Sequence, residues 1–249
     1  MQVELSQENS VAILKLNNPE KLNALSSDFM NKIYEKVADI EKTAKVLIIT
    51  GCEKAFAAGV NISEINTLSY ENAYLENFID HKWEAIFDVK IPVIAAVSGY
   101  ALGGGFELAL MCDIIVAAKN ATFGFPEVNL GIIPGMGGSQ MLTKIVGPKI
   151  AGEIIMTGRF ISAEEAANLK IVSYLTENHE LLEKSMELAE KIAKKSVMST
   201  RMIKESIRMA QDVGLNQGMK SERQMFRSLF STSYKQKGVS EFLNKKSKD

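Results

Sequence analysis

Short apolar segments separated by helix-like stretches constrain the fold of this chain more than any other feature. Four such segments occur in the first half, at Val11–Leu16, Val46–Thr50, Ile91–Val97 and Asp113–Ala118. Almost continuous apolar runs of this length are typical of strands that are buried on both faces. Helix-like stretches at 26–43, 70–88 and 103–111 lie between them. The alternation therefore predicts an α/β fold of parallel βαβ units with right-handed crossovers.

The second half of the chain changes to a helical pattern. Ser162 and Glu165 have capping-box spacing, and apolar residues recur at helical spacing in three later segments. These segments are 179–195, 197–212 and 214–230. We expect an α/β core at 1–195, a helical C-terminal region at 196–249, and a frayed tail at 244–249.

Composition excludes several classes of function. The net charge of −1 gives no general attraction to nucleic acid or to anionic membranes. Two cysteines without CxxC spacing and two histidines argue against a metal site or a disulfide-stapled scaffold. The N-terminal decapeptide lacks the pattern of a signal peptide, and no run of 18 apolar residues occurs. The expected location is cytoplasmic, with no metal, nucleic acid or membrane as partner.

Three glycine-containing segments are the candidates for chemistry. They are 54–62 (KAFAAGVNI), 99–107 (GYALGGGFE) and 123–138 (FGFPEVNLGIIPGMGG). The first two directly follow apolar runs, and the third comes shortly after one. Loops at the carboxyl ends of parallel strands form the ligand crevice of such sheets, so we expect all three there.

The triple glycine at 103–105 precedes a helix whose first N–H groups attract negative charge. Neither a P-loop nor a GxGxxG fingerprint is present, because Phe106, Glu107 and Leu108 occupy the required positions. A small oxyanion beside an acid/base group fits this turn, and a simple packing turn fits it equally well. The residues alone also leave Glu107 open to a dipole-stabilising role and Glu127 open to a solvated loop position.

Ordered sequence blocks along nearly the whole chain resemble the crotonase (enoyl-CoA hydratase/isomerase) superfamily. The blocks are NPEKLNAL from Asn18, AFAAGVNI, PVIAAVSGYALGGGFELALMCD, FGFPEVNLGIIPGMGGSQMLTKIVG, TGRFISAEEAANLKIV, and EFLNKK near the end. The resemblance implies a spiral of βαβ turns with C-terminal helices that mediate trimerisation. A homotrimer or a dimer of trimers is therefore expected.

The resemblance also assigns roles within an enoyl-CoA hydratase site. The backbone N–H groups of Val60 and Gly104 would form an oxyanion hole for the thioester oxygen. Glu107 and Glu127 would flank one water, with Glu127 delivering the proton to C2 and Glu107 orienting and deprotonating the water. Isomerase members commonly lack the first of these glutamates, so the pair favours hydration of 2-trans-enoyl-CoA.

Coenzyme A is expected as part of the substrate, with no permanently bound cofactor. By resemblance, the residues that contact the thioester and its coenzyme A are Lys21, Leu22, Ala58, Val60, Asn61, Ile62, Gly104, Phe242 and Lys245. Phe242 and either Lys245 or Lys246 are expected to reach the nucleotide, from the same subunit or from a neighbouring one. A solvated basic tail is the alternative interpretation of these residues. Region 65–88 is expected to form the floor of the acyl pocket.

Departures from the family pattern bear on the choice of substrate. Val60 and Asn61 stand where AGAD is frequent, so the site narrows and an Asp-specific role is lost. Phe125 replaces a common Gln, which predicts a more apolar wall, and Met141 replaces a frequent Arg. The alternative functions are an enoyl-CoA isomerase or another crotonase-type lyase, and a non-catalytic homologue that binds coenzyme A or RNA.

Overall fold

The computed structural model describes residues 2–80 and 82–246, with the side chains of the last two outside the description. The chain has a mixed α/β fold, which confirms the predicted class. The larger sheet has the order β1-β2-β3-β5-β7-β10 and is parallel except for the antiparallel β1–β2 pair. Its strands are β1 (Gln2–Glu8), β2 (Val11–Asn17), β3 (Val46–Thr50), β5 (Val93–Val97), β7 (Ile114–Ala118) and β10 (Tyr174–Thr176).

The four apolar runs form β2, β3, β5 and β7, as predicted. Alternate residues of these strands face two separate cores. Leu47 and Ala95 belong to one core, whereas Ile48 and Ile94 belong to the other. Helix α10 (Leu181–Ala193) covers the second face by packing on β3, β5 and β7. Burial on both faces explains why these strands are apolar throughout. Strand β1 was not predicted, because its residues are almost all exposed and do not form an apolar run.

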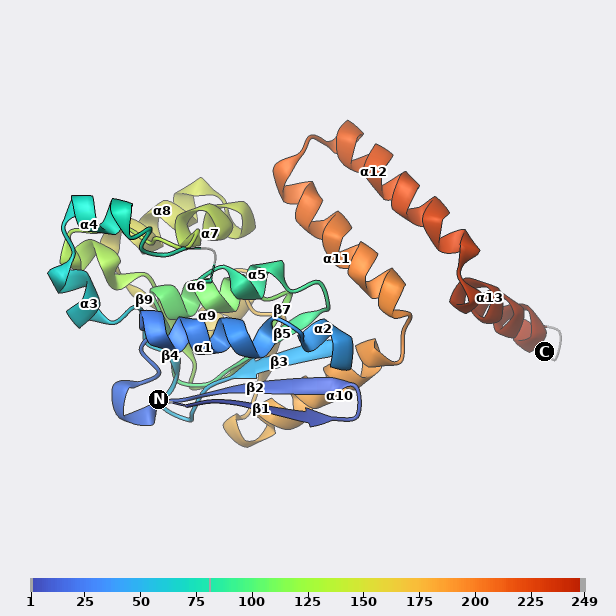
Figure 1. Cartoon of the computed structure of the whole chain (residues 1–249), viewed down its shortest axis with the longest axis horizontal. Coiled ribbons are helices and arrows are strands. Elements are labelled where there is room, and N and C mark those ends of the chain that lie inside the picture. Colours follow the sequence, from blue (N-terminus) through green and yellow to red (C-terminus); the bar gives the residue numbers. More distant parts are fainter. Residues whose placement is uncertain (1, 81, 247–249) are drawn as a thin grey trace.

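A second, smaller sheet turns the chain into a spiral. Its strands are β4 (Ala55–Ala57), β6 (Tyr100–Leu102), β8 (Thr122–Gly124) and the antiparallel β9 (Phe160–Ser162). Each of the first three follows a strand of the larger sheet, so β3–β4, β5–β6 and β7–β8 are three successive turns (Figure 1). The glycine-containing segments lie at the ends of these short strands.

Two predicted helices are interrupted. The stretch 26–43 divides into α1 (Ser27–Val37), which is capped by Ser26, and α2 (Ile40–Thr43). The continuous helix predicted at 70–88 is wrong. The chain forms α4 (Tyr70–Leu75) and α5 (Ala85–Asp88), because Asn77 and Ile79 adopt left-handed backbone angles that break the helix between them.

Helix α6 (Gly104–Leu110) packs unusually closely on the smaller sheet. A Cβ on Gly105 would lie 1.9 Å from the carbonyl oxygen of Ala57. Only glycine at this position lets the start of α6 approach β4 so closely. The remaining helices of the body are η1 (Pro19–Lys21), α3 (Ile62–Thr67), η2 (Pro126–Leu130), α7 (Gly138–Val146), α8 (Pro148–Thr157), α9 (Ala163–Asn168) and η3 (Asn178–Glu180).

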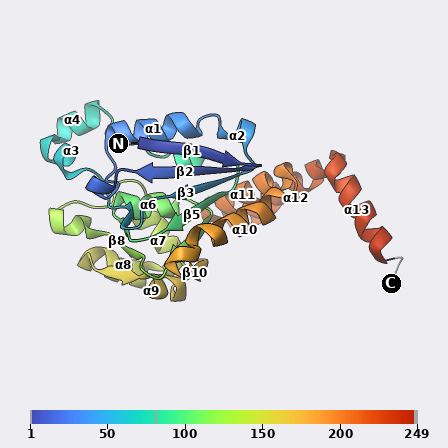
Figure 2. The same ribbon diagram turned by 90° about the horizontal axis from the view of Figure 1, so that it is seen from below.

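The C-terminal helices form an arm that extends from the α/β body (Figures 1 and 2). The arm consists of α11 (Val197–Asp212), α12 (Leu215–Ser228), η4 (Leu229–Ser231) and α13 (Ser233–Lys246). Lys204 of α11 is anchored to the body by Asp113 at 2.7 Å and by the carbonyl oxygen of Ile91 at 2.8 Å. Helix α13 ends at Lys246, so residues 244–246 of the expected frayed tail are helical, and residues 247–249 lie outside the described residues. No helix within residues 2–80 and 82–246 has the length and apolarity to span a membrane.

We predict opposite effects for the same substitution at two helical glycines. Gly105→Ala should lower the free energy of unfolding by about 3 kcal/mol, because the new methyl group meets backbone that cannot move aside easily. Gly152→Ala in α8 should be neutral or stabilising by up to about 1 kcal/mol, because its Cβ makes only ordinary contact. Urea unfolding of both variants measures the difference. Equal stability of the two would contradict the close approach of α6 to β4.

Candidate active site

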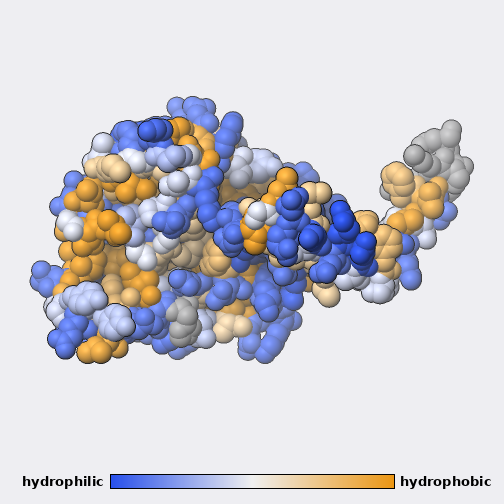
Figure 3. All heavy atoms as spheres, turned by 90° about the horizontal axis from the view of Figure 1, so that it is seen from above, coloured by the Kyte–Doolittle hydropathy of each residue, from blue (hydrophilic) through white to orange (hydrophobic). Residues whose placement is uncertain are grey.

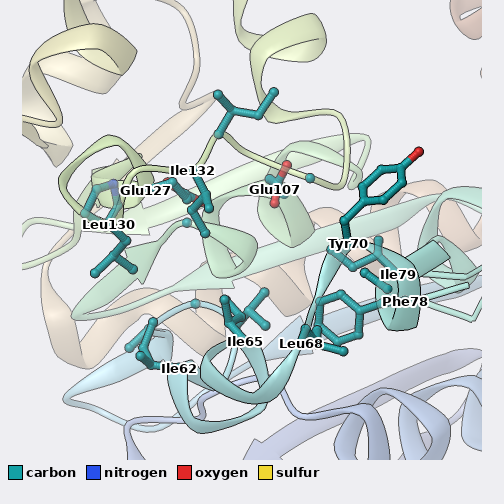
Figure 4. Close-up of a pocket in the computed structure, with 18 of the residues that line it drawn as sticks. Ile62, Ile65, Leu68, Tyr70, Phe78, Ile79, Glu107, Glu127, Leu130 and Ile132 are labelled. Atoms are coloured by element: carbon teal, nitrogen blue, oxygen red, sulfur yellow. The ribbon is translucent and has the colours of Figure 1, made fainter. Parts of the chain in front are cut away.

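The three glycine-containing segments meet at one cavity of about 330 Å³. Ala58–Val60 contribute from the first segment, Gly103 and Glu107 from the second, and Glu127 from the third. Figure 4 shows the two glutamates on one side of the cavity and, opposite them, apolar side chains of α3 and of the segment that follows it as far as Ile79. The apolar lining residues from that side are Ile62, Ile65, Leu68, Phe78 and Ile79. Two carboxyl groups thus face a mainly apolar space.

Glu107 is almost fully buried in the first turn of α6, with 1% of its surface exposed. Its Oε1 accepts hydrogen bonds from the backbone N–H groups of Met136 at 2.7 Å and Gly138 at 2.8 Å. Burial raises the pKa of Glu107 because it disfavours the charged carboxylate, and these backbone donors partly offset the rise. The carboxylate is therefore held rigidly inside the protein.

Glu127 lies in η2 directly after Pro126, and its carboxyl group faces Gly103. A Cβ on Gly103 would lie 2.7 Å from Oε1 of Glu127, so a side chain at this position would displace the carboxyl group. Burial raises the pKa of Glu127 to about 7, and the negative charge of Glu107 contributes to the rise. Its Oε2 is buried and has no hydrogen-bond partner among the described residues. These surroundings favour a neutral carboxylic acid near neutral pH.

The backbone at Val60 and Gly104 directs two N–H groups away from secondary-structure partners. Val60 forms a parallel bridge with Leu25, in which Leu25 bonds to Gly59 and Asn61. The N–H of Val60 therefore points away from Leu25. Gly104 is the first residue of α6, where a helix offers no internal acceptor for its N–H. The two segments are in contact, since a Cβ on Gly59 would lie 3.9 Å from the Gly104 nitrogen.

The residues expected to bind coenzyme A are divided between two regions. Ala58, Val60 and Ile62 line the cavity, and Asn61 caps α3 by accepting from the N–H of Ser63. An amide oxygen thus performs the capping that an aspartate would otherwise perform. The predicted pair Lys21 and Leu22 lies on an adjoining turn, whose Leu22 carbonyl oxygen accepts from the N–H of Ala58.

The C-terminal residues that were predicted to contact the nucleotide do not lie near the cavity of the same chain. Phe242 lies on α13, at the far end of the arm from the body (Figure 1). The side chain of Lys245 lies outside the described residues.

Two departures from the family pattern lie away from the cavity lining. Phe125 is fully buried and stacks on Phe106 with ring centroids 4.8 Å apart, so the expectation that it lines the wall is wrong. The aromatic core beneath the cavity accommodates it instead. Met141 lies on α7 and lines a second cavity between the body and α11.

Region 65–88 supplies part of the cavity lining, and its role as the floor of an acyl pocket stays a prediction. The backbone donors of Met136 and Gly138 were missed by sequence reasoning. Their segment was recognised as glycine-rich, but a main-chain donor leaves no side-chain signal. Among the described residues, no group of three or more His, Cys, Asp or Glu side chains is placed to hold a metal ion.

Comparisons with known proteins agree with this architecture. The model of the family described as enoyl-CoA hydratase/isomerase matches residues 6–249. A probable enoyl-CoA hydratase of Rhizobium meliloti is 42% identical over 95% of this chain and 92% of that protein. The mitochondrial enoyl-CoA hydratase of Pongo abelii is 40% identical over 96% of this chain and 82% of that protein.

Solved structures show the same relationship. An enoyl-CoA hydratase subunit from Geobacillus kaustophilus has a TM-score of 0.96 and 42% identity, covering 98% of this chain and 96% of that one. An enoyl-CoA hydratase from Bacillus anthracis has a TM-score of 0.91 and 35% identity, covering 98% and 97%. The chain therefore belongs to the enoyl-CoA hydratase/isomerase family, within the crotonase superfamily.

The raised pKa of Glu127 predicts a pH-dependent effect of Glu127→Gln on stability. A carboxyl group with a folded-state pKa of about 7 stabilises the fold below its unfolded pKa, and this contribution is lost as pH rises through about 7. Relative to the unaltered protein, the Tm of Glu127→Gln should therefore be higher at about pH 8 than at about pH 5. The exposed position Glu190 provides the control substitution. An identical Tm difference at both pH values would show that Glu127 ionises normally.

Proposed function

We propose that this chain is an enoyl-CoA hydratase, which adds water across the 2,3 double bond of 2-trans-enoyl-CoA. The observation that carries the proposal is the pair Glu107 and Glu127 facing one apolar cavity, both with raised pKa values. Paired carboxyl groups of this kind suit general acid–base catalysis near neutral pH. Relatives that bear the name enoyl-CoA hydratase support the same reaction.

Attack of water on C3 moves negative charge onto the thioester oxygen. We assign the N–H groups of Val60 and Gly104 as the donors that receive this oxygen. Two observations support this assignment. The N–H of Val60 points away from Leu25, and Gly104 lies at the start of α6. One such donor stabilises a transition state by about 3 kcal/mol, and the α6 dipole strengthens the Gly104 donor.

Glu107 and Glu127 divide the proton transfers between them. Glu107, fixed by two backbone N–H groups, orients the water and accepts its proton. Glu127, whose raised pKa keeps a proton available near pH 7, donates a proton to C2. The two carboxyl groups interact, so a pH–rate profile reports pKa values that belong to the pair.

Coenzyme A binding completes the proposed site. Lys21 and Leu22 lie on the turn beside the cavity, and Ala58–Ile62 offer backbone groups to the thioester arm. Helix α13, which carries Phe242, lies at the far end of the arm from the body (Figure 1), and this supports the proposal that Phe242 and Lys245 act on the site of a neighbouring subunit. In this proposal coenzyme A enters the site as part of the thioester substrate, and the reaction uses no further cofactor.

The helical arm supports self-assembly into a homotrimer or a dimer of trimers. Its helices expose apolar side chains that a single subunit leaves uncovered (Figure 3), as is typical of an interaction surface. The large exposed side chains on the arm are Met198, Ile203, Ile207, Val213, Leu215, Met219, Phe226, Phe230, Tyr234, Val239, Phe242 and Leu243. Location in the cytoplasm remains a prediction.

The proposed reaction predicts that crotonyl-CoA or a longer 2-trans-enoyl-CoA loses its conjugated absorbance when the protein is added. Glu107→Gln and Glu127→Gln should each lower kcat by about 100-fold or more, the range expected for a general acid–base group. Glu190→Gln is the control, because Glu190 is exposed on α10 and does not line the cavity, and it should leave kcat unchanged.

Failure of the folded, unaltered protein to hydrate any chain length would refute hydration. An enoyl-CoA isomerase, the alternative function, would instead shift the double bond of 3-enoyl-CoA and retain that activity in Glu107→Gln.

Assembly through the arm predicts that Phe226→Asp dissociates the oligomer. Phe226 is exposed in the single chain and stacks edge-on against Phe230 with centroids 4.9 Å apart, so a buried charge there would be costly in an apolar interface. Light scattering should show a trimer-sized or hexamer-sized particle for the unaltered protein and smaller particles for the variant. Gln224→Asp adds the same charge at an exposed polar position of α12 and should keep the assembly intact. A monomeric unaltered protein would contradict the proposal.

A further inference from the structure

We propose that Asn23 is a positioning residue for the oxyanion hole, an inference that rests on the proposed function. Asn23 lies outside the cavity lining and is completely buried. Its side chain joins the turn 18–25 to the segment 55–61, which includes Val60. The role of Asn23 is to hold Val60 so that its N–H meets the substrate oxygen.

The hydrogen-bonding capacity of the Asn23 side chain is directed to backbone groups of both segments. The N–H of Asn18 donates to Oδ1 at 2.7 Å. Nδ2 donates to the carbonyl oxygens of Ala55 at 2.9 Å and Phe56 at 3.0 Å. One amide thus closes the turn and ties it to β4.

Backbone hydrogen bonds extend this connection as far as Val60. The N–H of Ala58 donates to the Leu22 carbonyl oxygen at 3.0 Å, and the N–H of Leu25 donates to the Gly59 carbonyl oxygen at 2.7 Å. The N–H of Asn61 then donates to the Leu25 carbonyl oxygen at 2.8 Å. The turn therefore lies along 55–61 like an added strand. Its register leaves the N–H of Val60 on the side away from Leu25.

Few side chains meet the requirements at position 23. The backbone is left-handed there, with φ of 55°, which asparagine tolerates better than most residues. The site also needs one acceptor for an N–H and one group that donates to two carbonyl oxygens. Aspartate keeps the shape and the acceptor but lacks the amide donor. Asn23→Asp therefore replaces the connection to β4 by repulsion between a buried carboxylate and two carbonyl oxygens.

The test compares Asn23→Asp with Asn9→Asp. Asn9 has a similar left-handed backbone, with φ of 53°, in the exposed turn between β1 and β2. The two variants therefore share the chemical change and the backbone conformation but differ in burial and in distance from the site. Steady-state hydration of crotonyl-CoA gives kcat and KM. The probe for the oxyanion hole is acetoacetyl-CoA, whose enolate absorbs in the ultraviolet and forms more readily when its oxygen meets donors.

For Asn23→Asp we expect kcat to fall by about 10- to 100-fold, since a small misplacement of a catalytic group has effects of this size. KM should change less than kcat. The pH midpoint for enolate formation by bound acetoacetyl-CoA should move toward that of the free compound by about one unit. Asn9→Asp should match the unaltered protein in all three measurements. An unchanged enolate midpoint in Asn23→Asp would overturn the proposal, even if kcat fell.

Asn23→Gly provides a second variant if Asn23→Asp does not fold. Glycine accepts the left-handed backbone without strain, and the space left by the side chain admits water. The same shift of the enolate midpoint is expected. If neither variant folds, Asn23 serves the fold alone and the positioning role is refuted. If the unaltered protein hydrates no enoyl-CoA, the proposed function fails, whereas the acetoacetyl-CoA measurement still decides the role of Asn23.

Discussion

The close contact between α6 and β4 is the constraint on which the rest of the site depends. Gly105 lies against the Ala57 carbonyl group, so the first turn of α6 reaches the backbone that continues into Val60. The same turn carries Gly104 and Glu107, and the preceding Gly103 leaves space for Glu127. A side chain at position 105 would push the first turn of α6 away from β4, and all of these groups would move with it. One contact between a helix and a strand therefore sets the spacing of N–H donors and carboxyl groups.

Burial gives the two glutamates different properties although they share one cavity. Glu107 is tied to backbone donors, which favour its charged form, and Glu127 has an oxygen without a partner. Both pKa values are raised by desolvation, and repulsion from Glu107 adds to the rise at Glu127. These different environments support the proposed division of roles, in which Glu107 accepts a proton and Glu127 donates one.

Sequence patterns predicted the larger sheet well because both faces of β3 and β5 are covered, which makes these strands wholly apolar. The same reasoning missed β1, whose exposed residues have no such pattern. It also joined α4 and α5, because the left-handed angle at Ile79 is one that a β-branched residue rarely adopts. Asn77, which tolerates this conformation better than most residues, was not recognised as a break. At the site, glycines and carboxylates were visible as motifs. The donors to Glu107 and the bonds of Asn23 were not, because they depend on which backbone segments meet in space.

The spiral has a consequence for how the site responds to heat. Each of its three turns contributes one segment to the cavity, so no single turn contains a working part of the site. Local opening of any turn separates groups that must act together. The site therefore has no stability independent of the spiral, and the least stable turn sets an upper limit to its lifetime on heating.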